Sequence, residues 1–425
     1  MDFLKLQRSP KNFHHYILFL GLWLCSCQAC GQNISVSTSQ TGVQSGFSLV
    51  AIGDAGERNG ILEDNAGSMA ALFRHERFDL LIFLGDNFYK TGLNFESNKN
   101  PQKETPQKIN SVLGPFFPLM RALGRQNVHA IAGNHDYYAE LVVNKSFLWG
   151  LFSVDALPVG ITSKGNQRAD TISSWTYHYG LPQHALFPVE RSTGDSLQII
   201  FFDSAILLRT KLETWRPYFA ALERLLVSTQ NRPQIKWRIM AAHHPLYSLG
   251  EHGGYSEWDA EARTVQYLNH CDPDSDIVGY FTNFSDPEDL CAERYRAYRD
   301  SLFATIQRSG VAIQLFMAGH EHSLQLLNYP SRTPDCPNCP QAYLVSGAGA
   351  KASRVRAPAP ELGEHTWPDN NSKQRGKSRY GFARIDVQGE QLRVRIFDGK
   401  TGKELDMGGG RTELWVRPDG TLAER

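Results

Sequence analysis

Seven polar residues of types that bind metal ions follow short apolar runs along the chain. They are Asp54, Asp86, Tyr89, Asn134, His243, His320 and His322. Carboxylate, amide and phenolate oxygens combined with imidazole nitrogens suit iron, manganese or zinc. One carboxylate can bridge two such ions, and two ions about 3.5–4 Å apart can bind a phosphate and generate a hydroxide nucleophile. These residue types therefore predict a dinuclear site with phosphate-ester chemistry.

Each residue also has an ordinary structural interpretation. The aspartate of Gly53-Asp54-Ala55-Gly56 can bind backbone amides in a turn, Tyr89 can pack in the core, and His243-His244-Pro245 can end a strand. Five motifs of this kind occur in order, each after an apolar run. Gly133–Asp136 (GNHD) and Gly319–His322 (GHEH) are the least common of them. Their joint occurrence favours a metal site, a hypothesis that the structural context must confirm.

The apolar runs before these motifs are typical of strands buried on both faces. They cover residues 47–52, 80–84, 128–132, 239–242 and 311–318. Such strands belong to a sheet covered by helices, and ligands of open α/β sheets bind at the carboxyl ends of the strands. We therefore expect the motifs to converge on one site. In an extended segment, His320 and His322 would face the same side.

Further patterns predict the remaining elements. Apolar residues at helical spacing predict helices over 63–76 and 212–228. Residues 94–110 are polar and predict a surface loop. From residue 341 onward, alternation of apolar and polar residues between turn signals predicts strands.

Composition limits the class of protein. The chain has 425 residues, with 44 Lys+Arg against 44 Asp+Glu, so its formal net charge is zero. This balance argues against a protein that coats nucleic acid, which would be basic. The hydrophobic content of 41% and charged content of 21% exclude disorder as the main state. The length fits two or three domains, or one large α/β domain.

The N-terminal segment predicts export. Lys5, Arg8 and Lys11 precede the apolar run 16–24 (YILFLGLWL), and small residues follow it. This order is typical of a secretory signal peptide over 1–29, and the run is shorter than the roughly 18 residues that span a membrane. One alternative is an anchor that stays attached; another is a lipoprotein acylated at Cys27, with Cys30 as a competing site. Residues 30–46 are mainly small and polar and predict a tether.

Four cysteines lie beyond that segment, and an even number in an exported chain favours disulfides. Proximity in sequence favours the pairs Cys271–Cys291 and Cys336–Cys339. The alternative for Cys336 and Cys339 is half of a zinc knuckle or a redox motif.

The segments GDAG, GDNFY, GNHD, HHP and GHEH together resemble the signature of the calcineurin-like metallophosphoesterases. Within that superfamily, the tyrosine of GDNFY, with Gly85–Gly92, Tyr247–Gly253 and Val345–Gly349, is similar to the small, tartrate-resistant purple acid phosphatases. The chain resembles a bacterial-type exported member. The resemblance implies a four-layer α/β/β/α sandwich with two mixed sheets flanked by helices. It covers residues 47–400, with a rim insertion at 251–300 and a C-terminal β extension at 401–425.

The resemblance also implies roles for the polar residues. Asp54, Tyr89 and His322 would bind a ferric ion, Asn134, His243 and His320 would bind a second, divalent ion (Fe, Zn or Mn), and Asp86 would bridge the two. His135 and His252 resemble the histidines of the family that contact substrate, which can hold the oxyanion or protonate the leaving alcohol. Two positions depart from the family pattern: Ala242 stands where glycine usually precedes the histidine, and Glu321 replaces an aspartate.

The activity implied is that of an acid phosphatase. It is a phosphomonoester hydrolase whose dinuclear metal site activates hydroxide for in-line attack on the phosphate of a small molecule or phosphoprotein. One alternative is a phosphodiesterase or nucleotidase on the same site, and another is a non-catalytic surface binding protein. No nucleic-acid partner is expected, and membrane contact is expected only through an N-terminal lipid anchor. The predicted location is secreted, periplasmic or lipid-anchored.

Overall fold

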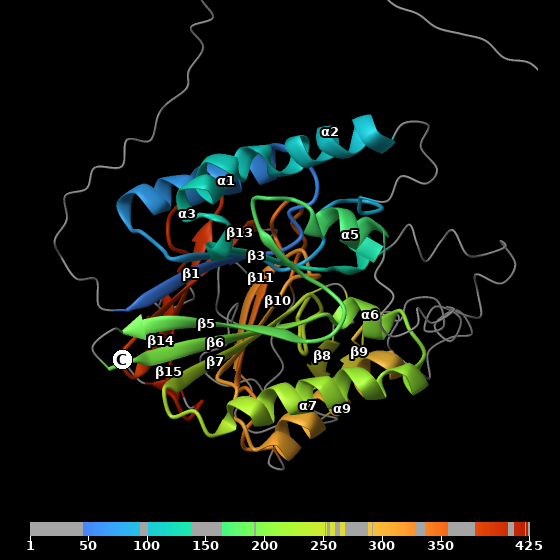
Figure 1. Ribbon diagram of the computed structural model, residues 1–425, viewed down its shortest axis with the longest axis vertical. Helices are drawn as coiled ribbons and strands as arrows, with labels where there is room; N and C mark the ends of the chain where they lie inside the picture. The colour runs from blue at the N-terminus through green and yellow to red at the C-terminus, as the bar shows by residue number, and fades with distance from the viewer. Residues whose placement is uncertain are drawn as a thin grey trace, which may run out of the picture. The chain divides into compact units, whose positions relative to one another are not determined.

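Two mixed β-sheets form the centre of the fold, and helices cover their outer faces (Figure 1). The computed structural model describes residues 46–93, 101–137, 164–190, 193–250, 252, 256–259, 264–267, 288–290, 292–328, 336–355, 379–406, 412–420 and 422–423. These residues all belong to one unit, Ser45–Arg425. The predicted signal peptide and all but the last residue of the tether lie outside the described residues.

The larger sheet has eight strands in the order β16-β15-β14-β13-β1-β2-β3-β4. Their bounds are β1 Phe47–Ile52, β2 Leu80–Phe83, β3 Val128–Ile131, β4 Thr176–His178, β13 Gly381–Gln388, β14 Gln391–Asp398, β15 Glu413–Val416 and β16 Leu422–Ala423. β1 to β4 run parallel, and β13 to β16 continue the sheet in antiparallel pairs.

The second sheet has six strands in the order β11-β12-β10-β7-β6-β5. Their bounds are β5 Gln183–Glu190, β6 Asp195–Phe202, β7 Ile235–Ala242, β10 Leu315–Ala318, β11 Leu324–Asn328 and β12 Ala342–Ser346. Its four inner strands are parallel, and its two edge strands are antiparallel to their neighbours. A short hairpin of β8 (Ser256–Asp259) and β9 (Thr264–Tyr267) lies within the predicted insertion.

Alternate residues of each strand pack into different cores. Leu49 and Ala51 of β1 belong to the cluster that joins the two sheets, together with Ile239 of β7. Val50 and Ile52 face the other way and pack with helical residues. Strands buried on both faces therefore appear as continuous apolar runs, which is why the sequence pattern located them correctly.

Helices cover both sheets (Figure 1). The helices beside the larger sheet are α1 Gly60–His75, α2 Pro101–Leu113 and α3 Phe117–Leu123. The helices beside the smaller sheet are α7 Arg216–Gln230 and α9 Glu293–Ser309. Two further helices, α5 Lys164–Asp170 and α6 Ser204–Leu208, are short. Among the described residues, single-turn 3₁₀ helices span Gly114–Phe116, Arg125–Asn127 and Leu212–Thr214. The predicted α/β architecture of two mixed sheets flanked by helices is confirmed.

One predicted element is wrong. Residues 94–110 were expected to form a surface loop, but α2 begins at Pro101. The helix is largely polar and contains Pro106, and within residues 104–113, where the structure describes burial, only Val112 and Leu113 are fully buried. Tertiary packing therefore stabilises a segment whose intrinsic helix preference is weak.

Two further expectations concern cysteines and the membrane. Cys336 and Cys339 form the predicted disulfide, whereas Cys271 and Cys291 lie outside the described residues. Among the helices that the structure describes, none has the length and apolar character required to cross a bilayer.

A buried ion network joins the end of α1 to the larger sheet. Asp386 of β13 accepts hydrogen bonds from Arg384 at 2.7 Å and from Arg395 of β14 at 2.9 Å, and Arg395 also reaches Glu76 at 2.6 Å. Asp386, Arg384 and Arg395 are all buried. Burial raises the pKa of Asp386, but the guanidinium groups, with Arg384 the largest contributor among them, outweigh burial and hold it below its ordinary value.

The Asp386→Asn variant is expected to lower the free energy of unfolding by about 3–5 kcal/mol at neutral pH, because buried arginines lose their counter-charge. The pKa of Asp386 is lower in the folded state than in the unfolded one. Its contribution to the free energy of unfolding is therefore present above the unfolded pKa of about 3.9 and is lost as the pH falls through the folded pKa. Urea unfolding at pH 7 and at pH 3 should therefore show a difference from wild type that shrinks in acid.

The matched control is Glu390→Gln, which removes the exposed partner of Lys236, 2.7 Å away. An exposed pair contributes about 0–1 kcal/mol, so this variant should unfold almost as wild type does. Equal effects of the two substitutions would contradict the importance assigned to the buried network.

Candidate metal centre

The predicted site residues follow the carboxyl ends of strands from both sheets. Asp54, Asp86 and Asn134 follow β1, β2 and β3 of the larger sheet, and His243 and His320 follow β7 and β10 of the smaller one. Among the residues that the structure describes, the non-glycines with positive φ are Asp54 (57°), Asp86 (51°) and His320 (68°). Backbone strain of this kind concentrates at functional sites, and here it occurs at three of the predicted ligands.

Asp54, Tyr89 and His322 form the first group. The Tyr89 hydroxyl donates to Asp54 Oδ1 at 2.9 Å and lies 3.1 Å from His322 Nε2, which is 3.7 Å from the same carboxylate oxygen. Burial, with a contribution from Asp86, raises the pKa of Asp54 to about 7. Burial and Lys351 lower the pKa of His322 to about 4. A neutral imidazole, a phenol and a carboxyl group thus face one point.

Asn134 and His243 belong to the second group, and Asp86 lies beside them. His243 Nδ1 donates to the Leu84 carbonyl oxygen at 2.8 Å, so its Nε2 faces Asn134 Oδ1 at 2.8 Å and Asp86 Oδ1 at 3.4 Å. Burial lowers the pKa of His243, but Asp86 and Asp54 outweigh burial and raise it overall. His243 Nε2 and the Oδ1 atoms of Asn134 and Asp86 can each offer a lone pair, and they face one another. A cation, either a proton or a metal ion, must therefore lie between them.

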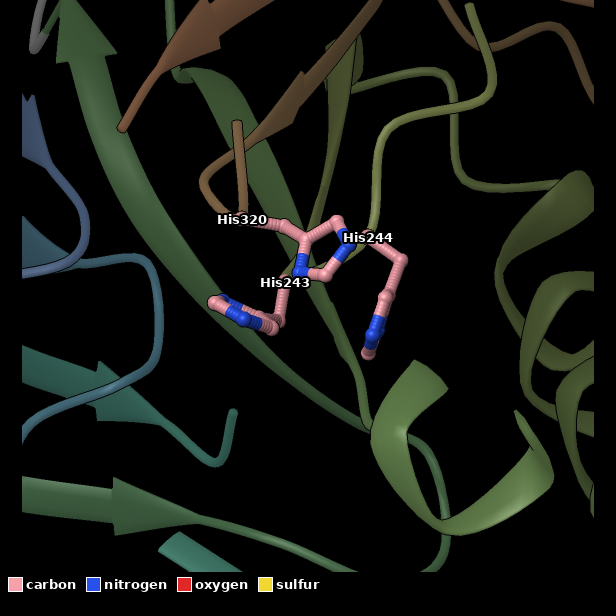
Figure 2. A group of neighbouring side chains, drawn as sticks. All are labelled: His243, His244 and His320. Atoms are coloured by element: carbon pink, nitrogen blue, oxygen red, sulfur yellow. The ribbon is translucent and has the colours of Figure 1, made fainter. Parts of the chain in front are cut away.

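His320 lies among three other histidines. Its ring centroid is 5.3 Å from that of His243, 4.4 Å from His244 and 4.3 Å from His252. Figure 2 shows that the rings of His243 and His244 point in different directions although the residues are adjacent. His244 pairs through Nδ1 with Ser204 Oγ at 2.9 Å.

The extended geometry expected for residues 320–322 is wrong, because His320 has a φ of 68°. The turn directs the His320 ring toward His243 and places His322 Nε2 at the Tyr89 hydroxyl. Two histidines separated by one residue therefore reach different groups of the same centre.

The two histidines predicted to contact substrate border this centre. His135 Nδ1 donates to the Lys90 carbonyl oxygen at 2.7 Å, and its Nε2 is 4.0 Å from Asp86 Oδ2. His252 Nδ1 lies 3.0 Å from Asp289 Oδ1. Both side chains are 28% exposed, so solvent reaches both imidazoles.

The donor atoms fit metal ions. Asp54, Asp86 and His243 bring one ligand atom each to within 4.8 Å of one another, as do His243, His244 and His320. His320 Nε2 is buried without a hydrogen-bond partner among the described residues. Burial and the surrounding histidines lower the pKa of His320 well below its ordinary value, which leaves the lone pair that a metal requires.

Two further buried carboxylates, Asp136 and Glu288, support the predicted residues, although the sequence motifs did not predict a role for either. Asp136 accepts from Gly133 N at 2.9 Å and from Asn87 Nδ2 at 2.9 Å, so it holds the loop after β3 against the loop after β2. The only sequence feature that indicated Asp136 was its place beside His135 in the GNHD motif. Glu288 Oε2 accepts from Asn134 Nδ2 at 3.0 Å. No sequence motif surrounds Glu288.

Gly85 directly precedes Asp86 in the loop after β2, and its replacement by alanine is expected to displace His243. Gly85 has a φ of 92°, and a Cβ there would lie 2.4 Å from His243 Nδ1. The strained backbone costs about 1–3 kcal/mol, and the displaced imidazole no longer faces Asn134. Gly85→Ala should therefore bind fewer metal ions per chain and unfold at a lower temperature, as measured by elemental analysis and calorimetry.

Gly67→Ala is the matched control, because Gly67 is exposed within α1 and a Cβ there meets nothing within 4 Å. It should retain its metal and gain about 0.5–1 kcal/mol of stability from the helix preference of alanine. Normal metal content in Gly85→Ala would show that the close approach to His243 does not matter.

Comparison with known proteins identifies the class. A family model described as "Calcineurin-like phosphoesterase" matches residues 47–324. Purple acid phosphatase 17 of Arabidopsis thaliana is 22% identical over 321 residues, which cover 72% of this chain and 69% of that protein. GAP50, the anchor in the inner membrane complex of Plasmodium, aligns with a TM-score of 0.50 at 12% identity over 85% of this chain and 88% of its own.

The family match covers more than half of the sequence, so the chain belongs to the calcineurin-like phosphoesterase family. Members of this family bind a dinuclear metal site and are hydrolases of phosphate esters. The similarity to GAP50 shows the shared fold. A dimetal phosphatase from Danio rerio aligns with a TM-score of 0.41 at 13% identity, over 87% of this chain and 98% of that one.

Proposed function

We propose that this chain is a phosphomonoester hydrolase of the purple acid phosphatase type. The observation that carries the proposal is the Tyr89 hydroxyl, which lies 2.9 Å from Asp54 Oδ1 and 3.1 Å from His322 Nε2. A phenol among the ligands of one ion suits ferric iron, and the Asn134, His243 and His320 group suits a divalent iron, zinc or manganese ion. The similarity to a purple acid phosphatase of Arabidopsis thaliana supports the same proposal.

The two metal ions, when bound, neutralise phosphate charge and supply the nucleophile for hydrolysis. The residues of the chain hold and orient the reacting groups. Asp86 lies between the two ligand groups, because ligand atoms of Asp54, Asp86 and His243 lie within 4.8 Å of one another. Its Oδ1 is 3.4 Å from His243 Nε2 and accepts a hydrogen bond from the His135 amide at 2.9 Å. We assign to Asp86 the bridge between the ions.

His135 and His252 are proposed to contact the phosphate ester. The Lys90 carbonyl oxygen fixes the proton of His135 on Nδ1, so Nε2 is the atom that exchanges a proton with substrate. Asp289 orients His252 in the same way through Nδ1. A protonated imidazole at either position can stabilise a phosphate oxygen or protonate the leaving alcohol.

The test is hydrolysis of a phosphate monoester and a phosphate diester by the purified, metal-reconstituted chain from acid to alkaline pH. Preference for the monoester with an acid optimum is the expected result. Preference for the diester would assign a phosphodiesterase or nucleotidase instead. No turnover of either would favour a binding protein, a role with a parallel in GAP50, which is described as an anchor and shares the fold.

We further propose that the chain is exported, because a basic segment, an apolar run and small residues follow one another within residues 1–29. Residues 30–46 would tether the phosphoesterase domain at 47–400, which carries the rim insertion at 251–300 and the C-terminal β extension at 401–425. The test is the mass of the chain recovered after expression. Loss of the predicted signal peptide is the expected result, and an uncleaved N-terminus would contradict the proposal.

A further inference from the structure

Glu288 is a buried carboxylate in the segment between β9 and α9. It is 4% exposed and belongs to the predicted insertion at 251–300. Its neighbours are the side chains of Asn134 from the loop after β3 and Arg209 from the end of α6. A buried carboxylate is costly unless it is paired and hydrogen-bonded, so these contacts explain how the chain accommodates it.

The contact with Asn134 has a definite direction. A carboxylate only accepts hydrogen bonds, so the atom of Asn134 that faces Glu288 Oε2 at 3.0 Å must be the amide nitrogen. The amide oxygen then points the other way, to within 2.8 Å of His243 Nε2. An asparagine binds a cation only through its oxygen. Glu288 therefore selects the orientation of Asn134 that can bind a metal ion.

Arg209 holds Glu288 in place. Arg209 Nε donates to Glu288 Oε1 at 2.6 Å, and the guanidinium balances the buried negative charge. His244 Nε2 is 3.9 Å from the same oxygen, and the other nitrogen of His244 pairs with Ser204 Oγ at 2.9 Å. The Arg209 ion pair thus holds the carboxylate through Oε1, the oxygen that does not face Asn134.

We propose that Glu288, held by Arg209, is a positioning residue that fixes the Asn134 carboxamide and so sets the affinity of the chain for the second metal ion. The inference rests on the proposed function, because it takes Asn134 as a ligand of that ion. It also gives the insertion a role in the metal centre. Substitution of residues that orient metal ligands typically lowers metal affinity by about 10- to 100-fold.

The experiment is a zinc titration of the metal-free full chain against a competing chelator, which yields separate affinities for the first and second ion. Glu288→Gln and Glu288→Ala are compared with wild type. Glutamine keeps the size of the side chain but can present either end of its amide. We expect both variants to lose about 10- to 100-fold in affinity for the second ion and less than about twofold for the first.

Glu293→Gln is the matched control, since Glu293 is an exposed acid five positions away at the start of α9. It should bind both ions as wild type does. Unchanged affinity for the second ion in both Glu288 variants would overturn the inference. Equal losses of both ions with a lower melting temperature would also overturn it, because that result indicates a general structural role.

Arg209→Lys provides a second route if the Glu288 variants do not fold. Lysine keeps the charge but not the two-nitrogen contact with Glu288, so a selective loss of second-ion affinity supports the inference and no change overturns it. The proposed function fails separately. A wild-type chain that binds two zinc ions but hydrolyses no phosphate monoester would contradict the phosphatase and leave the role of Glu288 intact.

Discussion

Asp86→Ala is expected to abolish both hydrolysis and the binding of two metal ions. Asp86 is 2% exposed and lies between the two ligand groups, with its oxygens near His243 and His135. Its removal takes one negative charge from a centre that must hold two cations, and it also removes the acceptor of the His135 amide. When residues act as a unit, the loss of one of them costs on the order of 10⁴-fold or more in turnover.

Metal content by elemental analysis and turnover of a phosphate monoester test this expectation together. Asp170→Ala is the control, because Asp170 is exposed at the end of α5, and it should retain both properties. Full activity of the wild type with one metal ion per chain would contradict the dinuclear centre, and full activity of Asp86→Ala would contradict the bridge.

Tyr89→Phe is expected to remove the visible colour of the oxidised, iron-loaded chain. The colour would arise from charge transfer between a phenolate and ferric iron. Burial, Asp54 and Asp86 raise the pKa of Tyr89 well above its ordinary value, so its hydroxyl keeps its proton unless a cation replaces it. Lys351 Nζ lies 3.4 Å from the centre of the Tyr89 ring and adds a positive charge that assists this replacement.

Absorption spectra of the two oxidised proteins at equal iron content provide the measurement. Tyr380→Phe serves as the control, because the Tyr380 hydroxyl donates to Asp64 at 2.7 Å and not to a predicted ligand, and this variant should keep its colour. A wild type that is colourless at full iron loading would contradict the assignment of ferric iron to the Tyr89 group.

The sequence predicted the strands, and the place of the candidate ligands at their ends, for one physical reason. Parallel strands buried on both faces are continuous apolar runs, and the residues that end them must lie at a sheet edge. Asp54, Asp86 and His243 could therefore be placed together before any coordinates were known. The same argument failed for α2, whose polar residues and Pro106 carry little helical signal.

Glu288 shows a second limit of sequence analysis. Its partner Asn134 is 154 positions away, and its neighbours in sequence form no motif. Only tertiary structure distinguishes a carboxylate that orients a ligand from the many acids of a solvated segment. Similarly, the turn at His320 could not be predicted, because its positive φ is imposed by contacts such as the 2.7 Å bond from its amide to Asp54 Oδ2.

The predicted ligands come from both sheets, and this has a consequence for the lifetime of the protein. One sheet supplies Asp54, Asp86, Tyr89 and Asn134, and the other supplies His243, His320 and His322. Ions held by both sets would bind the folded chain and not the unfolded one. At a free metal concentration 1,000 times the dissociation constant, one such ion adds about 4 kcal/mol of stability by mass action. For an exported chain, the availability of trace metal would therefore govern resistance to proteolysis as well as turnover.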